Sequence, residues 1–202
     1  MARMAVAAMR GGAKGIRANS VADIQAIKKE IDLPIIGIIK QDYDDSSIFI
    51  TPTLKEIKAL LSVGVDIIAT DATNRKRPND EKIEDIVQYV KEHAPEVALM
   101  ADISSVDEAV EAERLGFDCI STTLVGYTKE TKGTSMADHD FKILKEMIQS
   151  VSKPIIGEGQ INTPLKAEKS LEHGAHFIVV GGAITRPQVI TKVFVDSIHN
   201  IQ

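Results

Sequence analysis

Short apolar runs alternate along the chain with longer stretches whose apolar residues keep helical spacing. Residues 33–40 form a near-continuous apolar run, typical of a strand that is covered on both faces. Thr53 and Glu56 then make a capping box, and apolar residues follow at helical spacing. The pattern therefore predicts a strand followed by a helix.

The same alternation recurs along the whole chain. Strands are predicted over residues 14–19, 33–40, 66–73, 98–102, 119–124, 154–158 and 177–180. Helices are predicted over residues 1–12, 20–31, 53–64, 83–90, 105–115, 141–151, 163–171 and 187–198. Seven strands and eight helices in strict alternation predict a (β/α)₈ TIM barrel, in a single domain over residues 1–202. Because the first helix has no strand before it, we expect the first β-strand of the barrel to lie upstream of Met1.

A short internal repeat supports this architecture. Pro34-Ile-Ile-Gly37 recurs as Pro154-Ile-Ile-Gly157. The two copies lie on the third and seventh strands of the predicted barrel, which are opposite one another in a ring of eight. Aligning the copies gives Lys40 and Glu158 the same side-chain parity. We therefore expect a lysine and a carboxylate to face each other across the barrel mouth.

Composition narrows the class of protein without naming a function. With 44% hydrophobic residues, the 202-residue chain can bury one full core. Its apolar runs are too short to cross a bilayer and no signal peptide follows Met1, so no membrane partner and no export are expected. A net charge of −5 without a basic cluster argues against nucleic acid. The single cysteine, Cys119, is expected to be buried, and the lack of a disulfide framework fits the cytoplasm.

Polar residues gather where the predicted strands end, which is where barrels of this kind carry their active sites. The strand-end residues are Arg17, Lys40, Asp71, Asp102, Thr122 or Thr123, Glu158, Gly159, Gly181 and Gly182. After the last strand, the glycine pair offers backbone N–H groups and the start of a helix, and Arg186 adds a fixed positive charge. This segment is predicted to bind phosphate. The long polar loop 125–136 is a candidate lid.

Each of these positions also has a purely structural explanation. Lys40 and Glu158 are compatible with a structural ion pair, and Arg17 with a salt-bridge partner for a neighbouring aspartate. Asp71 or Asp102 would be suitable as a cap for the helix that follows. The glycine pair is also an ordinary turn between a strand and a helix. No histidine pair has metal-ligand spacing, and no nucleotide-binding fingerprint occurs, so neither a metal nor a nucleotide is predicted.

Several strand ends, taken in order, resemble those of one known family. The segments that carry the resemblance are Gly-Gly-Ala-Lys-Gly-Ile-Arg-Ala-Asn19, Gly-Ile-Ile-Lys-Gln-Asp-Tyr43, Ala-Thr-Asp-Ala-Thr73, Met-Ala-Asp-Ile-Ser104, Thr-Thr-Leu-Val-Gly-Tyr-Thr128, Gly-Glu-Gly159 and Val-Gly-Gly-Ala-Ile-Thr-Arg-Pro187. They are similar to successive strand ends of the N-acylglucosamine-6-phosphate 2-epimerase family, and the similarity spans essentially the whole chain.

The resemblance implies a TIM barrel that interconverts N-acetylmannosamine 6-phosphate and N-acetylglucosamine 6-phosphate in the breakdown of amino sugars and sialic acid, without a metal or other cofactor. By resemblance, Lys40 and Glu158 are the catalytic residues. The residues that it implies for substrate binding are Arg17, Asp102, Asp71 and Tyr127, and those for phosphate binding are Gly159, Gly181, Gly182 and Arg186. Family members carry a polar residue, usually glutamine, on a first strand that would precede this sequence.

Two alternative functions stay open at this point. One is a barrel enzyme of aldolase type whose lysine forms a Schiff base with a phosphorylated substrate. The other is a sugar-phosphate binder without catalysis. In either case a homo-oligomer, most simply a dimer, is expected. The apolar stripe of the last helix, which comprises Ile190, Val193, Phe194 and Ile198, predicts packing on the barrel, with exchange of this helix between protomers as the alternative.

Overall fold

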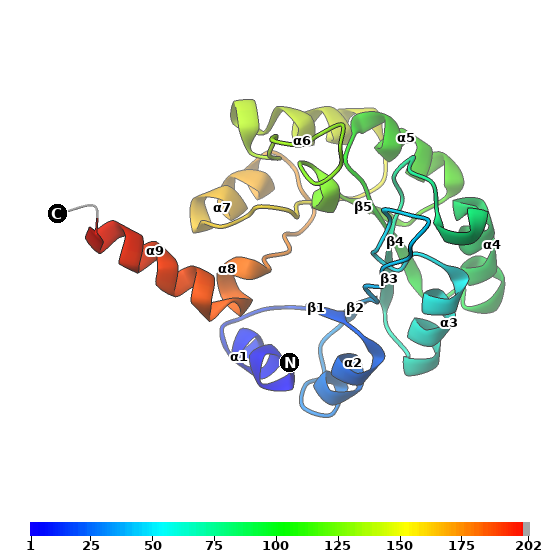
Figure 1. Cartoon of the computed structure of the whole chain (residues 1–202), viewed down its shortest axis with the longest axis horizontal. Helices are drawn as coiled ribbons and strands as arrows, with labels where there is room; N and C mark the ends of the chain where they lie inside the picture. Colours follow the sequence, from blue (N-terminus) through cyan, green and yellow to red (C-terminus); the bar gives the residue numbers. More distant parts are fainter. Residues whose placement is uncertain (200–202) are drawn as a thin grey trace.

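Six parallel strands form one curled sheet in the computed structural model, which describes residues 1–199. The strands are β1 (Ile16–Asn19), β2 (Ile35–Ile38), β3 (Ile67–Asp71), β4 (Ala98–Asp102), β5 (Cys119–Ser121) and β6 (Ile155–Ile156). They pair in the order of the sequence, from β1 to β6. Figure 1 shows the sheet curving like part of a barrel wall, with helices around its outside. The predicted α/β barrel architecture is confirmed in this part of the chain.

Helices connect the strands and cover the convex face of the sheet (Figure 1). They are α1 (Ala2–Arg10), α2 (Val21–Lys28), α3 (Leu54–Val63), α4 (Ile83–His93), α5 (Val106–Leu115), α6 (Asp138–Ser150), α7 (Pro164–Glu172), α8 (Gly182–Thr185) and α9 (Pro187–His199), with 3₁₀ turns at Pro78–Asp80 and Thr122–Leu124. Capping fixes several of their starts. In the predicted capping box of α3, the Thr53 side chain and the Glu56 carboxylate satisfy each other's backbone N–H groups.

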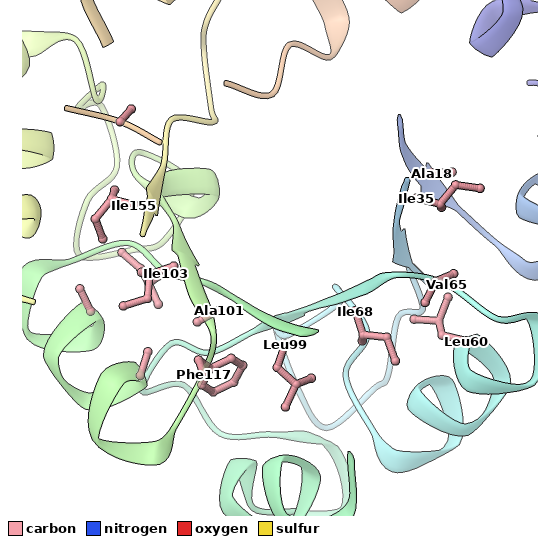
Figure 2. Packing of buried hydrophobic residues seen from close by; sticks show 14 of the residues in the cluster. Ala18, Ile35, Leu60, Val65, Ile68, Leu99, Ala101, Ile103, Phe117 and Ile155 are labelled. Carbon is pink, nitrogen blue, oxygen red and sulfur yellow. The ribbon is translucent and has the colours of Figure 1, made fainter. Parts of the chain in front are cut away.

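Alternation along the strands separates two apolar clusters. Residues of one parity, such as Ile68, Leu99 and Ala101, pack against the helices in the main core (Figure 2). Residues of the other parity, such as Ile38 and Met100, form a second cluster, on the inner face of the sheet. Strand-end residues that continue the second parity therefore point into the mouth of the curled sheet.

The prediction of a seventh strand was wrong. Within residues 177–180, only Ile178 pairs with the sheet, through a single bridge to Gly157. The short β6 explains this, because its two residues leave little ladder for a further strand to extend. Several other predicted strands are also shorter than expected, and β5 gives way to a 3₁₀ turn at Thr122.

The predicted packing of the last helix was also wrong. Its apolar residues were predicted to pack on the barrel, but Val193, Phe194 and Ile198 are each more than 60% exposed. Figure 1 shows α9 extending away from the sheet. The short helix α8, which lies directly before α9, was not predicted. Among residues 1–199, no helix combines the length and apolarity that spanning a membrane requires.

Candidate active site

The inner-face parity brings three predicted site residues into contact at the carboxyl ends of the strands. Arg17 comes from β1, Asp102 ends β4, and Glu158 follows β6. Arg17 Nη2 donates to Asp102 Oδ2 at 2.5 Å and Arg17 Nη1 to Asp102 Oδ1 at 3.0 Å. The same Nη1 donates to Glu158 Oε2 at 2.8 Å. One guanidinium thus joins two carboxyl groups that are far apart in the sequence.

Arg17 lies in a nearly water-free position. Its side chain is 8% exposed and that of Asp102 is fully buried. Although burial lowers it, the pKa of Arg17 is raised above its usual value by the charges of Asp102 and Glu158 and by hydrogen bonds to both. The guanidinium therefore stays charged, and it offers the fixed planar geometry that a bidentate pair requires.

Glu158 is the group of this cluster whose protonation is most finely balanced. Burial raises its pKa, the charge of Arg17 opposes that rise, and the nearby Asp102 carboxylate raises the pKa further, to about 7 in all. A carboxyl group with this pKa can both give and take a proton at neutral pH, which is what acid–base catalysis needs.

Lys40 is held at the same mouth by its backbone. Its N–H donates to Asn19 Oδ1 at 2.8 Å, and the residue forms a bridge with Ile50. Its ammonium group lies 5.7 Å from the centre of the Phe49 ring. The charge of Lys40 is felt at Glu158, where it lowers the pKa. The side chain itself is exposed, so a small substrate could reach its amine.

The residue before Lys40 is fixed by a threonine that sequence patterns did not single out. Ile39 N–H donates to Thr51 Oγ1 at 3.2 Å, and Thr51 N–H donates to the Ile39 carbonyl at 2.8 Å. Thr51 is fully buried and has φ of 45°, an unfavourable value for a β-branched residue. This local strain lies next to the end of β2, where it restricts the backbone that carries Lys40.

Three consecutive hydroxyl residues, which begin with the last residue of β5, complete the cluster. Thr123 Oγ1 donates to Asp102 Oδ1 at 2.7 Å. Ser121 Oγ lies 2.8 Å from Thr123 Oγ1. Thr122 contacts the backbone of Glu158. The rule that strand ends carry the site pointed to Thr122 or Thr123, but it could not tell which partner each hydroxyl would take.

Two predicted substrate contacts are not hydrogen-bonded to this cluster, although Asp71 lies beside Asp102 in the register of the sheet. Asp71 is fully buried and accepts hydrogen bonds from Thr73 and Arg75, with Arg75 Nη2 at 2.5 Å. Burial raises its pKa, and the charge of Arg75 opposes the rise. These bonds stabilise the turn after β3 and are not the helix cap that the sequence left open, because α4 begins at Ile83 and no side chain caps its start. Tyr127, in the loop after the 3₁₀ turn, is 60% exposed.

The glycines of the predicted phosphate site lie at one end of the sheet. Gly159 follows Glu158 with φ of 92°, and a side chain there would meet the carbonyls of Thr122 and Thr123 at 3.2 Å. Gly181 follows the segment that bridges Gly157, and its carbonyl accepts the first N–H groups of the turn at α8. Arg186 lies at the end of α8 and is exposed to solvent. Within residues 1–199, no three His, Cys, Asp or Glu side chains are arranged to hold a metal ion.

The chain has a curled parallel sheet wrapped in helices, with a lysine and two carboxyl groups joined by Arg17 at the carboxyl edge. This arrangement defines the chain as an enzyme of the α/β-barrel class. Comparison with known proteins makes this more specific. The sequence model of a family described as putative N-acetylmannosamine-6-phosphate epimerase matches residues 1–200. The chain belongs to this family.

Individual relatives agree with the family match. The chain is 56% identical over 199 residues to a putative N-acetylmannosamine-6-phosphate 2-epimerase of Shouchella clausii, covering 98% of this chain and 87% of that protein. It is 56% identical over 203 residues to the protein of the same name from Borreliella afzelii, covering 100% of this chain and 88% of that protein.

Solved structures show the same relation. The structure of the N-acetylmannosamine-6-phosphate 2-epimerase from Clostridium perfringens matches with a TM-score of 0.91 and 54% identity, over 96% of this chain and 83% of that one. Thiamine phosphate pyrophosphorylase from Pyrococcus furiosus matches with a TM-score of 0.61 at 21% identity, over 90% of this chain and 79% of that one. The second likeness concerns the fold alone.

Proposed function

We propose that the chain converts N-acetylmannosamine 6-phosphate to N-acetylglucosamine 6-phosphate by inverting carbon 2. The family and its relatives supply the reaction, and the Arg17, Asp102 and Glu158 cluster beside Lys40 is the observation that carries it. A proton-transfer reaction at a carbon beside a carbonyl needs a base and an acid within reach of one small substrate, and this cluster offers both.

The chemistry follows from the substrate. The sugar ring opens to the aldehyde, the proton on carbon 2 is removed, and a proton returns to the opposite face of the same carbon. Two assignments suit the cluster. In the first, Lys40 removes the carbon 2 proton and Glu158 moves the proton of the ring oxygen. In the second, Lys40 and Glu158 act on opposite faces of carbon 2. Both need Glu158 to change its protonation near neutral pH, as its pKa of about 7 allows.

The remaining predicted residues would bind and orient the substrate. Arg17 and Asp102 are proposed to contact the sugar, with Asp71 and Tyr127 as further candidate contacts. Gly159, Gly181 and Gly182, together with Arg186, are proposed to bind the phosphate. The surroundings of Gly181 support this assignment, because no atom lies within 4 Å of the place where a side chain would begin, which leaves room for a ligand against the backbone.

Proton NMR in deuterated water tests the function directly. With N-acetylmannosamine 6-phosphate as substrate, we expect the carbon 2 proton signal to disappear while the gluco epimer appears with deuterium at carbon 2. Lys40→Ala and Glu158→Gln are each expected to slow turnover by about 10²- to 10⁴-fold. Absence of both exchange and epimer from the unmodified chain would overturn the epimerase assignment.

Borohydride trapping and a binding measurement, added to the NMR experiment, separate the two alternatives. A Schiff-base enzyme would form an adduct on Lys40 that borohydride traps, whereas proton transfer leaves the lysine unmodified. A binder without catalysis would bind the sugar phosphate but give neither exchange nor epimer.

The cellular setting is part of the same proposal. We infer a role in the breakdown of amino sugars derived from sialic acid, and a place in the cytoplasm. Burial of the single cysteine, whose pKa is raised to about 12, supports a chain that forms no disulfide. We also propose that residues 1–202 form one domain and that the chain is a homodimer. The exposed apolar residues of α9 support the dimer.

A further inference from the structure

The backbone at Glu158 lies beyond the end of the sheet ladder. β6 ends at Ile156, two residues before Glu158. Glu158 is also flanked by Gly157 and Gly159, and glycine restricts the backbone least of all residues. A carboxyl group at such a point would be poorly positioned unless something other than the ladder held it.

Thr122 supplies that hold. Glu158 N–H donates to Thr122 Oγ1 at 3.0 Å, and Thr122 Oγ1 lies 2.7 Å from the Glu158 carbonyl, to which it donates. A single hydroxyl therefore bonds both polar backbone groups of Glu158. In a sheet, a neighbouring strand would satisfy these two groups.

The hydroxyl has one proton, so its donor can serve only one acceptor at a time. The Glu158 carbonyl at 2.7 Å is closer than the Ile156 carbonyl at 3.4 Å and the Met136 sulfur at 3.1 Å. Thr122 is fully buried, so water cannot replace these bonds. The side chain of Glu158, by contrast, is held by Arg17.

We propose that Thr122 is a positioning residue, which fixes the backbone of Glu158 so that its carboxyl group keeps the place that proton transfer requires. This inference rests on the proposed epimerase function, because the gain from positioning appears in turnover. It separates the roles of two neighbours: Thr123 bonds Asp102, whereas Thr122 bonds Glu158 through its main chain.

Two replacements of Thr122 differ in whether they keep the hydroxyl group. Thr122→Val keeps the shape and removes the hydroxyl, and Thr122→Ser keeps the hydroxyl and removes the methyl group. Since a displacement of about 1 Å can cost about 10²-fold in rate, we expect Thr122→Val to lower kcat by about 10- to 100-fold with KM little changed. Thr122→Ser should retain kcat within a factor of about three.

The matched control is Ser62→Ala. The hydroxyl of Ser62 also donates to a backbone carbonyl, that of Ala59 at 2.7 Å, but it is exposed and lies in α3, on the outer side of the sheet. This variant should keep normal kcat. Thermal unfolding of all three variants shows whether each is folded at the assay temperature. Should Thr122→Val be unfolded there, Thr122→Ala removes the same hydroxyl with a smaller side chain.

A double variant tests whether Thr122 acts through Glu158. In a Glu158→Gln background, Thr122→Val should cost little further activity, because the group that it positions is already gone. Full additivity of the two losses, a wild-type kcat for Thr122→Val, or an equal loss in Thr122→Ser would each overturn the proposal.

An activity-independent measurement keeps this inference distinct from the epimerase assignment. The carboxyl carbon signal of Glu158, identified by its loss in Glu158→Gln, can be titrated by NMR. Without the hydrogen bonds from Thr122 to its backbone, the carboxyl group of Glu158 should reach water. Its titration midpoint should therefore fall in Thr122→Val and stay unchanged in Thr122→Ser. If the wild-type chain shows no proton exchange at carbon 2, the epimerase assignment is overturned. If the titration midpoint of Glu158 is unmoved in Thr122→Val, the role of Thr122 is overturned.

Discussion

The protonation of Glu158 is set mainly by burial and by two charged neighbours of opposite effect. Burial favours the neutral carboxyl group, Arg17 favours the carboxylate, and Asp102 again favours the neutral form. Arg17 is shared between the two acids through one guanidinium, so a change at either acid alters the other. Two predictions at the scale of single residues follow from this arrangement.

Glu158 is expected to make the stability of the folded chain fall with rising pH. Its pKa is raised from 4.5 to about 7, so between these values the folded chain keeps a proton that the unfolded chain has released. The stabilisation is complete below pH 4.5 and is lost as the pH rises through 7. The shift corresponds to about 3 kcal/mol of unfolding free energy.

Urea unfolding of the wild type and Glu158→Gln across this pH range measures the effect. Glutamine stays neutral, so the difference in unfolding free energy between the two chains should shift in favour of the variant as the pH rises. A difference that does not change with pH would contradict a protonated, buried Glu158.

Asp102→Asn is expected to lower the pKa of Glu158. The substitution removes a negative charge that raises this pKa, and it leaves Arg17 to pair with Glu158 alone. The pH dependence of kcat/KM reports groups of the free enzyme, so its midpoint near pH 7 should move to lower pH. Thr123→Val is the contrasting variant, because it keeps the Asp102 charge and removes a hydrogen bond that lowers the pKa of Glu158, so its midpoint should move to higher pH. An unmoved midpoint in Asp102→Asn, or a higher one, would contradict the coupling.

Sequence reasoning could predict that these residues lie together, but it could not predict the protonation of Glu158. Side-chain parity and the strand-end rule predicted that Arg17, Asp102 and Glu158 would lie at one mouth, and they are in contact. The pKa of Glu158 could not be predicted, because burial and two opposite charges act on it over distances that only the folded chain defines. The hold of Thr122 was equally hidden, since the strand-end rule pointed to Thr122 or Thr123 but no sequence pattern gives the partner of a hydroxyl group.

At the scale of elements, the glycine of each Pro-Ile-Ile-Gly copy lies where side chains of neighbouring segments pack closely against a strand. A side chain added at Gly37 would meet Val65 Cγ1 at 2.8 Å and Leu60 Cδ2 at 3.0 Å. At Gly157 it would meet Ile178 Cδ1 at 2.8 Å. The sequence showed the repeat, and the structure gives its physical reason: glycine lets neighbouring side chains pack directly on the strand.

Gly37→Ala is therefore expected to destabilise the fold by overpacking, by about 1–3 kcal/mol. Val65→Ala alone should also cost stability, because it leaves a cavity beside a buried strand. The double variant exchanges a methyl group across the contact, so its cost should be smaller than the sum of the two single costs. Urea unfolding of all four chains measures this coupling, and simple additivity would contradict the close approach.

Predictions for whole elements succeeded where a local signal exists. Helix starts at Ser20, Thr53 and Ser105 carry the predicted side-chain caps. Strand ends were predicted too long, because apolar runs continue into residues that leave the ladder. The four residues of α8 are too few to show helical periodicity, so no pattern in the sequence could reveal this helix.

At the scale of the whole molecule, alternation of strands and helices was enough to predict a barrel-like parallel sheet. Each strand is the neighbour of the next strand in the sequence, as expected when each helix returns the chain to the adjacent place in a parallel sheet. The place of α9 could not be predicted in this way. An apolar stripe shows that a helix will be covered, but it does not show whether its own chain or another covers it.

The exposed stripe of α9 leads to a prediction about assembly. Phe194 is 67% exposed and Val193 65%, which is unusual for neighbouring large apolar residues on a helix. In a symmetric dimer each such contact occurs twice. Burial of a phenylalanine contributes about 1.5–3 kcal/mol, so loss of two copies should weaken dimerisation by more than about 100-fold.

Phe194→Glu is therefore expected to shift the chain from dimer to monomer in sedimentation equilibrium. Gln188→Glu is the matched control, because it adds the same charge to an exposed polar position of the same helix and should leave the dimer intact. Circular dichroism should be alike for both variants, since Phe194 lies outside the core. A wild-type chain that sediments as a monomer at all concentrations would contradict the dimer, and a dimer that survives Phe194→Glu would move the interface away from α9.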